Sequence, residues 1–100
     1  MIFLVLTEDC HTIEWKDKET LLKEEVRYVW NLQKRGIIRN IWFVRNSKSA
    51  VLMVEAESEG KVKELFDTLP LVKEQLIRYK VLELAAYNGY ERLFLDGNNK

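Results

Sequence analysis

The sequence contains a single cysteine, Cys10, a single proline, Pro70, and a single histidine, His11. One cysteine excludes a disulfide within the chain, and this usage favours a protein of the reducing cytoplasm. No apolar run approaches the roughly 20 residues that cross a bilayer, so we expect no membrane partner. Basic and acidic residues number 16 each, which gives a formal net charge of zero. Because nucleic-acid-binding domains usually carry a basic excess, we expect no nucleic-acid partner either.

Residues that bind metals are also scarce. Asp9, Cys10 and His11 lie too close together in the sequence to form a metal site without distant partners. His11 could be a ligand or a general base, but a lone histidine in a loop is usually solvated. We therefore expect neither a metal site nor a cofactor, and the sequence assigns no role to Cys10 or His11.

Two segments have the apolar spacing of amphipathic helices. The first covers residues 18–35. The second covers residues 59–68, with Ser58 as its N-cap and Pro70 as the residue that stops it. We expect residues 72–75 to form a short connection to the last strand.

Four segments with a high apolar content predict strands over residues 2–7, 37–44, 50–56 and 76–87. The resulting order, β-α-β-β-α-β, is typical of the α+β ferredoxin-like fold. In that fold both helices cover one face of a four-stranded antiparallel sheet. We expect one such domain over residues 1–87. Residues 88–100 would form a C-terminal arm that packs on a neighbouring subunit.

The predicted strands carry more apolar surface than two helices can cover. In the central hairpin, the alternation of side chains places Ile41, Phe43, Val51 and Met53 on the helix-free face of the sheet. A monomer would then expose a larger apolar patch than soluble monomers usually tolerate. We therefore expect a homodimer in which two such faces pack together and form a dimeric α/β barrel.

One carboxylate falls inside the apolar sector of the first helix. Glu25 lies among Leu21, Leu22, Val29 and Leu32 when the residues are spaced at about 100°. A carboxylate in such surroundings must be paired, hydrogen-bonded or protonated. Glu25 is therefore either a structural residue in a salt bridge or a general acid and base whose pKa is shifted by desolvation.

A second charged residue interrupts the apolar hairpin. If the hairpin turns over residues 46–48, Arg39 falls opposite Glu55 on the neighbouring strand. The two side chains would then form a cross-strand ion pair. Alternatively, Arg39 binds the carboxylate of a substrate, because a guanidinium group matches carboxylate geometry with two hydrogen bonds.

Four blocks of residues are similar to the muconolactone isomerase family, and the similarity covers about residues 23–87. The blocks are Leu32-Gln33-Lys34-Arg35-Gly36, Arg39-Asn40-Ile41-Trp42, Val54-Glu55-Ala56-Glu57-Ser58 and Asp67-Thr68-Leu69-Pro70-Leu71. The resemblance implies a ferredoxin-like subunit, a two-chain barrel and often a larger ring of such dimers. It also implies a pocket between the sheet and the first helix, closed by a neighbour's C-terminal segment.

The resemblance implies a reaction as well. The family moves a double bond within an unsaturated lactone that carries a carboxylate, by proton abstraction and return, without metal or organic cofactor. It implies Glu25 as the catalytic proton shuttle, Arg39 as the carboxylate anchor and Trp42 as a wall of the pocket. Glu55, beside Arg39, completes the predicted substrate-binding set. The expected ligand is a small organic acid.

The sequence departs from the family in ways that leave other functions open. Residues 7–11 replace a longer polar segment, the hairpin turn lacks glycine, and residues 87–90 replace a polar C-terminal segment. A non-catalytic small-molecule-binding or assembly protein of the same architecture is therefore one alternative. A cofactor-independent monooxygenase-like barrel is another.

Overall fold

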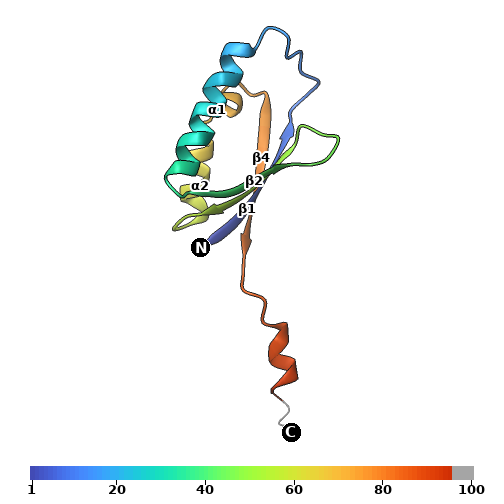
Figure 1. Cartoon of the computed structure of the whole chain (residues 1–100), viewed down its shortest axis with the longest axis vertical. Coiled ribbons are helices and arrows are strands. Elements are labelled where there is room, and N and C mark those ends of the chain that lie inside the picture. The colour runs from blue at the N-terminus through green and yellow to red at the C-terminus, as the bar shows by residue number, and fades with distance from the viewer. Residues whose placement is uncertain (96–100) are drawn as a thin grey trace.

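The computed structural model describes residues 1–95 and has the predicted order of strands and helices (Figure 1). The strands form one antiparallel sheet in the order β2-β3-β1-β4. They are β1 (Ile2–Asp9), β2 (Ile38–Phe43), β3 (Ala50–Glu55) and β4 (Ile77–Leu84). The helices α1 (Glu19–Lys34), α2 (Glu59–Phe66) and α3 (Pro70–Lys73) cover one face of this sheet. This arrangement is the α+β ferredoxin-like fold.

Helix α1 ends because Gly36 adopts a backbone conformation that other residues rarely tolerate. Its φ angle is 79°, in the left-handed region. The Gly36 N–H donates to the carbonyl of Gln33, and the Ile37 N–H donates to the carbonyl of Leu32, both at 3.0 Å. These two bonds form a Schellman motif, which satisfies the last carbonyls of the helix and turns the chain into β2.

The second helical region differs from the prediction after its first turns. Ser58 caps α2 as predicted, and its hydroxyl accepts a hydrogen bond of 3.1 Å from the Lys61 N–H. However, α2 ends at Phe66, and Pro70 begins the short helix α3. The prediction that the helix runs to residue 68 and is stopped by Pro70 was therefore wrong. Proline suits the first position of a helix, since its fixed φ is helical and no N–H is needed there.

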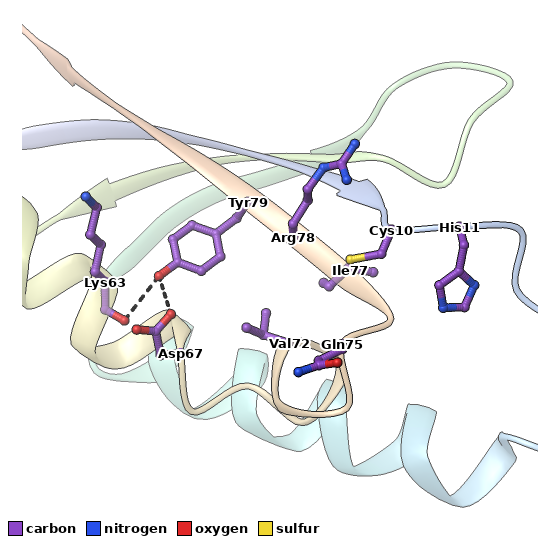
Figure 2. A pocket seen from close by; sticks show the side chains of 9 residues that line it. All are labelled: Cys10, His11, Lys63, Asp67, Val72, Gln75, Ile77, Arg78 and Tyr79. Atoms are coloured by element: carbon purple, nitrogen blue, oxygen red, sulfur yellow. Dashed lines mark hydrogen bonds between the residues drawn. The ribbon is translucent and has the colours of Figure 1, made fainter.

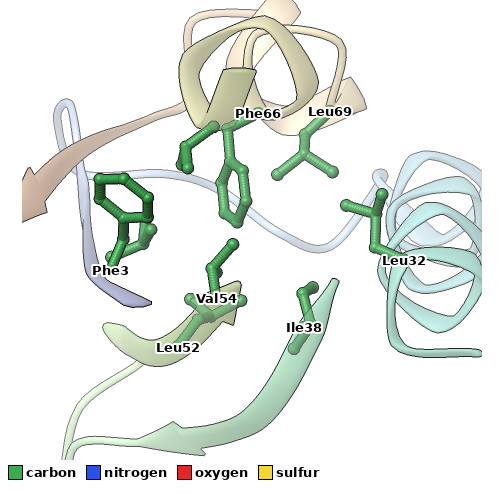
Figure 3. Packing of buried hydrophobic residues seen from close by; sticks show 9 residues of the cluster. Phe3, Leu32, Ile38, Leu52, Val54, Phe66 and Leu69 are labelled. Carbon is green, nitrogen blue, oxygen red and sulfur yellow. The ribbon is translucent and has the colours of Figure 1, made fainter. Parts of the chain in front are cut away.

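The hydrophobic core lies between the helices and one face of the sheet (Figure 3). Strand side chains on this face meet Leu32 of α1, Phe66 of α2 and Leu69, which precedes α3. Nine residues form the buried cluster: Phe3, Val5, Leu32, Ile38, Leu52, Val54, Val62, Phe66 and Leu69. The side chains of each strand alternate between the two faces, so this single core uses only half of the strand residues.

A β-bulge at Arg39 sets the register of the central hairpin. The pairing of β2 with β3 shifts by one residue between Ile38 and Asn40. Arg39 is the extra residue, so the prediction that it pairs directly with Glu55 in the ladder was wrong. An extra residue in a strand moves every following side chain to the opposite face.

This bulge decides which side chains of β2 face the helices. Ile41 pairs with the core residue Leu52, whereas Trp42 pairs with Val51 on the opposite face. Phe43, one position further, returns to the helix side. The prediction that Ile41 and Phe43 lie on the helix-free face was therefore wrong, and Trp42 lies there instead.

The helix-free face of the sheet, which we call the open sheet face, is largely apolar. Val51 and Met53 lie on it as predicted, and no described helix covers it. Trp42 and Leu84 at its edges are 49% and 42% exposed. Its apolar side chains are Ile2, Leu4, Leu6, Trp42, Val51, Met53, Leu82 and Leu84.

The chain beyond β4 projects away from the sheet (Figure 1). β4 ends at Leu84, three residues before the predicted end of the strand, and the 3₁₀ helix η1 (Gly89–Leu93) follows. The rings of Tyr87 and Tyr90 meet edge to face with centroids 4.9 Å apart. The large apolar side chains of this segment, including Leu93 and Phe94, are each at least 68% exposed. Residues 96–100 of the predicted arm lie outside the described residues.

Candidate functional site

A partly open cavity of about 400 Å³ lies between α1 and the helix-covered face of the sheet. Its walls are mainly apolar, and the side chains come from α1, from all four strands and from the region of α3. Representative wall residues are Leu22, Val26, Val29, Ile41, Phe43 and Leu52. Val26 and Phe43 are 64% and 73% exposed, so they mark the mouth of the cavity beside the edge strand β2.

Glu25 of α1 lines this cavity and is held there by the start of α3. Its Oε1 accepts a hydrogen bond of 3.0 Å from the backbone N–H of Leu71. Leu71 follows Pro70 in the first turn of α3, where backbone N–H groups lack partners within the helix. The bond fixes one carboxylate oxygen and leaves the other available to the cavity.

The apolar surroundings raise the pKa of Glu25 above its ordinary value of 4.5. The main cause is burial, because the ionised form loses hydration in this cavity. The hydrogen bond from Leu71 acts in the opposite direction, since it stabilises the carboxylate, but its effect is smaller. Glu25 therefore combines a fixed position with a pKa shifted towards neutrality, as a group that both accepts and donates protons requires.

The raised pKa predicts a pH-dependent effect of Glu25→Gln on stability. The folded protein holds the Glu25 proton to a higher pH than the unfolded chain, so ionisation of Glu25 destabilises the fold as pH rises above about 4.5. Glutamine keeps the acceptor for Leu71 without a charge. We expect the melting temperature of Glu25→Gln relative to wild type to increase between about pH 4 and pH 8. Thermal melts across this range measure it, and a constant difference in melting temperature would contradict a raised pKa of Glu25.

The other polar groups of the cavity were not predicted from the sequence. The Thr7 hydroxyl accepts a hydrogen bond of 2.8 Å from the Ala50 N–H. Asp9 also lines the cavity. Lys48, from the hairpin turn, holds its Nζ 5.3 Å from the ring centroid of Trp15, and both residues line the cavity. In the sequence, Thr7, Asp9 and Lys48 are marked only by their positions near the end of β1 and the start of β3.

The structure brings Arg39 and Glu55 together but separates them from Glu25. The Arg39 guanidinium forms an ion pair with Glu55, and its Nε donates to the Gly36 carbonyl at 2.7 Å. The two side chains are 51% and 45% exposed. Trp42 lies on the open sheet face, on the other side of the sheet from Glu25. None of these three predicted substrate-binding residues lines the cavity.

A second, more polar hollow of about 630 Å³ lies beside β4 and contains both Cys10 and His11 (Figure 2). Tyr79 points its hydroxyl towards Asp67, to which it donates at 2.5 Å, and burial together with this bond raises the Tyr79 pKa. Arg78 donates to Glu8 at 2.6 Å. Tyr79, Asp67 and Arg78 of this hollow are thus already engaged in hydrogen bonds, which makes the hollow the weaker candidate.

Two further findings concern residues 1–95. Within this range, no group of three or more histidine, cysteine, aspartate or glutamate side chains is placed to hold a metal ion. Among the described helices, none has both the length and the apolar content to cross a membrane.

Comparisons with known proteins agree with this fold. Residues 1–89 match the sequence model of the family described as muconolactone delta-isomerase. A crystal structure of muconolactone isomerase has a TM-score of 0.76 and 18% identity, over 89% of this chain and 93% of that chain. A comparison with curated proteins found no match.

A second solved structure is that of a 5-chloro-2-hydroxyhydroquinone dehydrochlorinase from Burkholderia phenoliruptrix AC1100, in complex with 2,5-dihydroxybenzoquinone. It has a TM-score of 0.62 and 16% identity, over 87% of this chain and 96% of that chain. At these identities the structural likeness concerns the fold. The family match covers residues 1–89, which is most of the chain, and therefore shows the family as well as the fold. This chain belongs to the muconolactone delta-isomerase family.

Proposed function

We propose that this protein is an isomerase that moves a double bond within a small unsaturated lactone or carboxylic acid, with Glu25 as the proton shuttle. Membership of the muconolactone delta-isomerase family supports this class of reaction. The observation that carries the proposal is the position of Glu25. It is a carboxylate with a raised pKa, held at one oxygen by the Leu71 N–H, in the wall of an apolar cavity.

In this reaction Glu25 acts first as base and then as acid. The carboxylate removes a proton from the saturated carbon next to a C=C bond that is conjugated with a carbonyl group. The C–H electron pair forms a new C=C bond, and the electrons of the old double bond move towards the carbonyl oxygen. The C=O bond then re-forms, and the protonated Glu25 returns the proton to the carbon beside the carbonyl, so that only the double bond has moved. A pKa nearer to neutral pH assists both steps, and apolar walls limit competing water.

The size and chemistry of the cavity support a small, mainly apolar ligand. The walls are apolar, and the volume of about 400 Å³ lies in the range of small-molecule sites. The dehydrochlorinase that shares this fold was solved with a flat quinone, 2,5-dihydroxybenzoquinone. We propose an unsaturated ring or a conjugated acid as the ligand of the present protein.

We also propose that the open sheet face packs on the same face of a second copy, giving a homodimer with a dimeric α/β barrel. The eight apolar side chains on this face support the pairing, because soluble monomers rarely leave a largely apolar sheet face uncovered. Substrate binding by Arg39, Trp42 and Glu55 would require a site other than this cavity, because none of the three lines it.

The C-terminal arm, residues 88–100, is proposed to pack on a neighbouring subunit. In its described part, Tyr90 and Phe94 are 68% and 78% exposed. The mouth of the cavity offers a matching apolar surface at Val26 and Phe43. An arm seated there would close the cavity against water.

A non-catalytic binding protein is the alternative, because an apolar cavity also suits a protein that only holds its ligand. Incubation of the protein with muconolactone in D₂O separates the two functions. An isomerase is expected to incorporate deuterium into the lactone, seen by proton NMR, at a rate above that of the buffer. Binding of the lactone with neither movement of its double bond nor exchange above the buffer rate would overturn the proposed catalysis.

A further inference from the structure

We propose that Lys48 is the anion-binding residue of the cavity, and that it holds the carboxylate of a flat unsaturated acid so that the reacting carbon faces Glu25. This inference deepens the proposed function and rests on it. It replaces Arg39, the anchor that the sequence predicted, with a residue that lines the cavity.

The charges that line the cavity support this choice. Of the sixteen described lining residues, Lys48 is the one basic side chain, while Asp9 and Glu25 are acidic. The remaining lining residues are uncharged. An anionic ligand is therefore attracted to a single position on the wall, and both carboxylates repel it.

The hairpin turn fixes the backbone that carries Lys48. The Val44 N–H donates to the Ser49 carbonyl at 2.8 Å, which closes the loop between β2 and β3. Within that loop the Ser49 N–H donates to the Ser47 hydroxyl at 2.9 Å. Lys48 lies between Ser47 and Ser49, so the turn holds the backbone of Lys48 at the end of the cavity.

Trp15 positions the ammonium group itself. The Lys48 Nζ lies 5.3 Å from the centroid of the Trp15 ring, within the range of a cation–π contact. None of the ion pairs among residues 1–95 involves Lys48. A cation–π contact leaves ammonium N–H groups free to donate, so Lys48 can bind a carboxylate, while Arg39 is already engaged with Glu55 and Gly36.

The arrangement dictates how a ligand lies in the cavity. A carboxylate bound by Lys48 stays away from Glu25, because the two negative charges repel each other in apolar surroundings. The uncharged, conjugated part of the ligand then extends along the apolar wall towards Glu25. The base thus meets a carbon atom rather than the carboxylate of its own substrate.

The test uses two probes of the same shape, trans-cinnamate and the neutral trans-cinnamamide. We expect the wild-type protein to bind cinnamate about tenfold more tightly than the amide, the size of effect that one charge-assisted hydrogen bond supports. Lys48→Gln should reduce this ratio to about one and remove the salt dependence of cinnamate binding, while Lys48→Arg should keep the preference. Calorimetric titration of each variant gives the ratios.

Lys16→Gln is the matched control, since it removes the same charge from a residue next to Trp15 that does not line the cavity. It should leave the ratio of the two affinities unchanged. Equal affinity of the wild-type protein for the two probes, binding of neither, or an unchanged preference in Lys48→Gln would each overturn the inference. Because these measurements require no turnover, they can fail while deuterium exchange by Glu25 persists, and the reverse also holds.

Discussion

Replacing Glu25 with glutamine is expected to slow the exchange of deuterium into muconolactone by about 10²–10⁴-fold, the range typical of one general acid–base residue. Glutamine retains an oxygen that can accept the hydrogen bond from the Leu71 N–H, so the position of the side chain should be kept. What it lacks is the ability to take up and release a proton. Proton NMR of the lactone in D₂O measures the rate directly.

The control for this result is Glu24→Gln on the same helix. Glu24 is exposed and does not line the cavity, so its replacement removes one carboxylate while leaving the exchange rate within about twofold. Binding of the lactone by Glu25→Gln should persist, because most of the cavity wall is unchanged. Full exchange activity in Glu25→Gln would show that another group carries the proton.

Placing a charge at the centre of the open sheet face is expected to convert a dimer into monomers. Leu4 on the inner strand β1 pairs with Met53 on one side and with Leu82 on the other, so its side chain lies in the middle of this face. Leu4→Glu would force a carboxylate into the subunit interface, at a cost of several kcal/mol. A cost of about 3 kcal/mol weakens dimerisation by more than a hundredfold, which sedimentation equilibrium detects.

Trp42→Glu provides a second variant in case Leu4→Glu perturbs folding, because Trp42 lies on an edge strand and is already half exposed. It should also weaken the dimer. Tyr28→Glu on α1, an exposed apolar side chain away from the open sheet face, is the control and should leave the dimer intact. A wild-type protein that sediments as a monomer at micromolar concentration would contradict the proposed pairing altogether.

The order of elements could be predicted from the sequence because local signals agreed with the final fold. The apolar spacing of α1 and the Ser58 cap of α2 are local features that tertiary packing did not override. Pro70 was misinterpreted because proline both ends helices and begins them. Which of the two occurs depends on whether the residues after it can pack, and Leu71, which is buried, does.

The faces of β2 could not be predicted because the bulge at Arg39 has no clear signal in the sequence. Alternation along a strand assumes one residue per step, and a single extra residue reverses every later assignment. Trp42 lies on the open sheet face for this reason. The contact between Arg39 and Glu55 was still anticipated, because a long arginine side chain can reach its partner from a bulged position.

The candidate site could be predicted only as far as Glu25. A carboxylate within the apolar sector of a helix conflicts with the residues around it, and this conflict is visible in the sequence of that helix alone. Lys48 gives no such signal, since a lysine in a polar turn is usually solvated. Its relation to the cavity depends on the twist of the hairpin and on the loop that carries Trp15, neither of which the sequence specifies.

The bulge at Arg39 also links the two surfaces of the sheet, because successive side chains of one strand lie on opposite faces. Trp42 belongs to the open sheet face, and its neighbours Ile41 and Phe43 belong to the cavity wall, so a single short strand serves both surfaces. If a second copy packs on Trp42, the position of the strand contributes to the free energies of assembly and of ligand binding alike. Dimerisation and ligand binding are then thermodynamically linked. A ligand that favours the position of β2 in the dimer increases the dimerisation constant by a certain factor. Dimerisation increases the affinity for that ligand by the same factor.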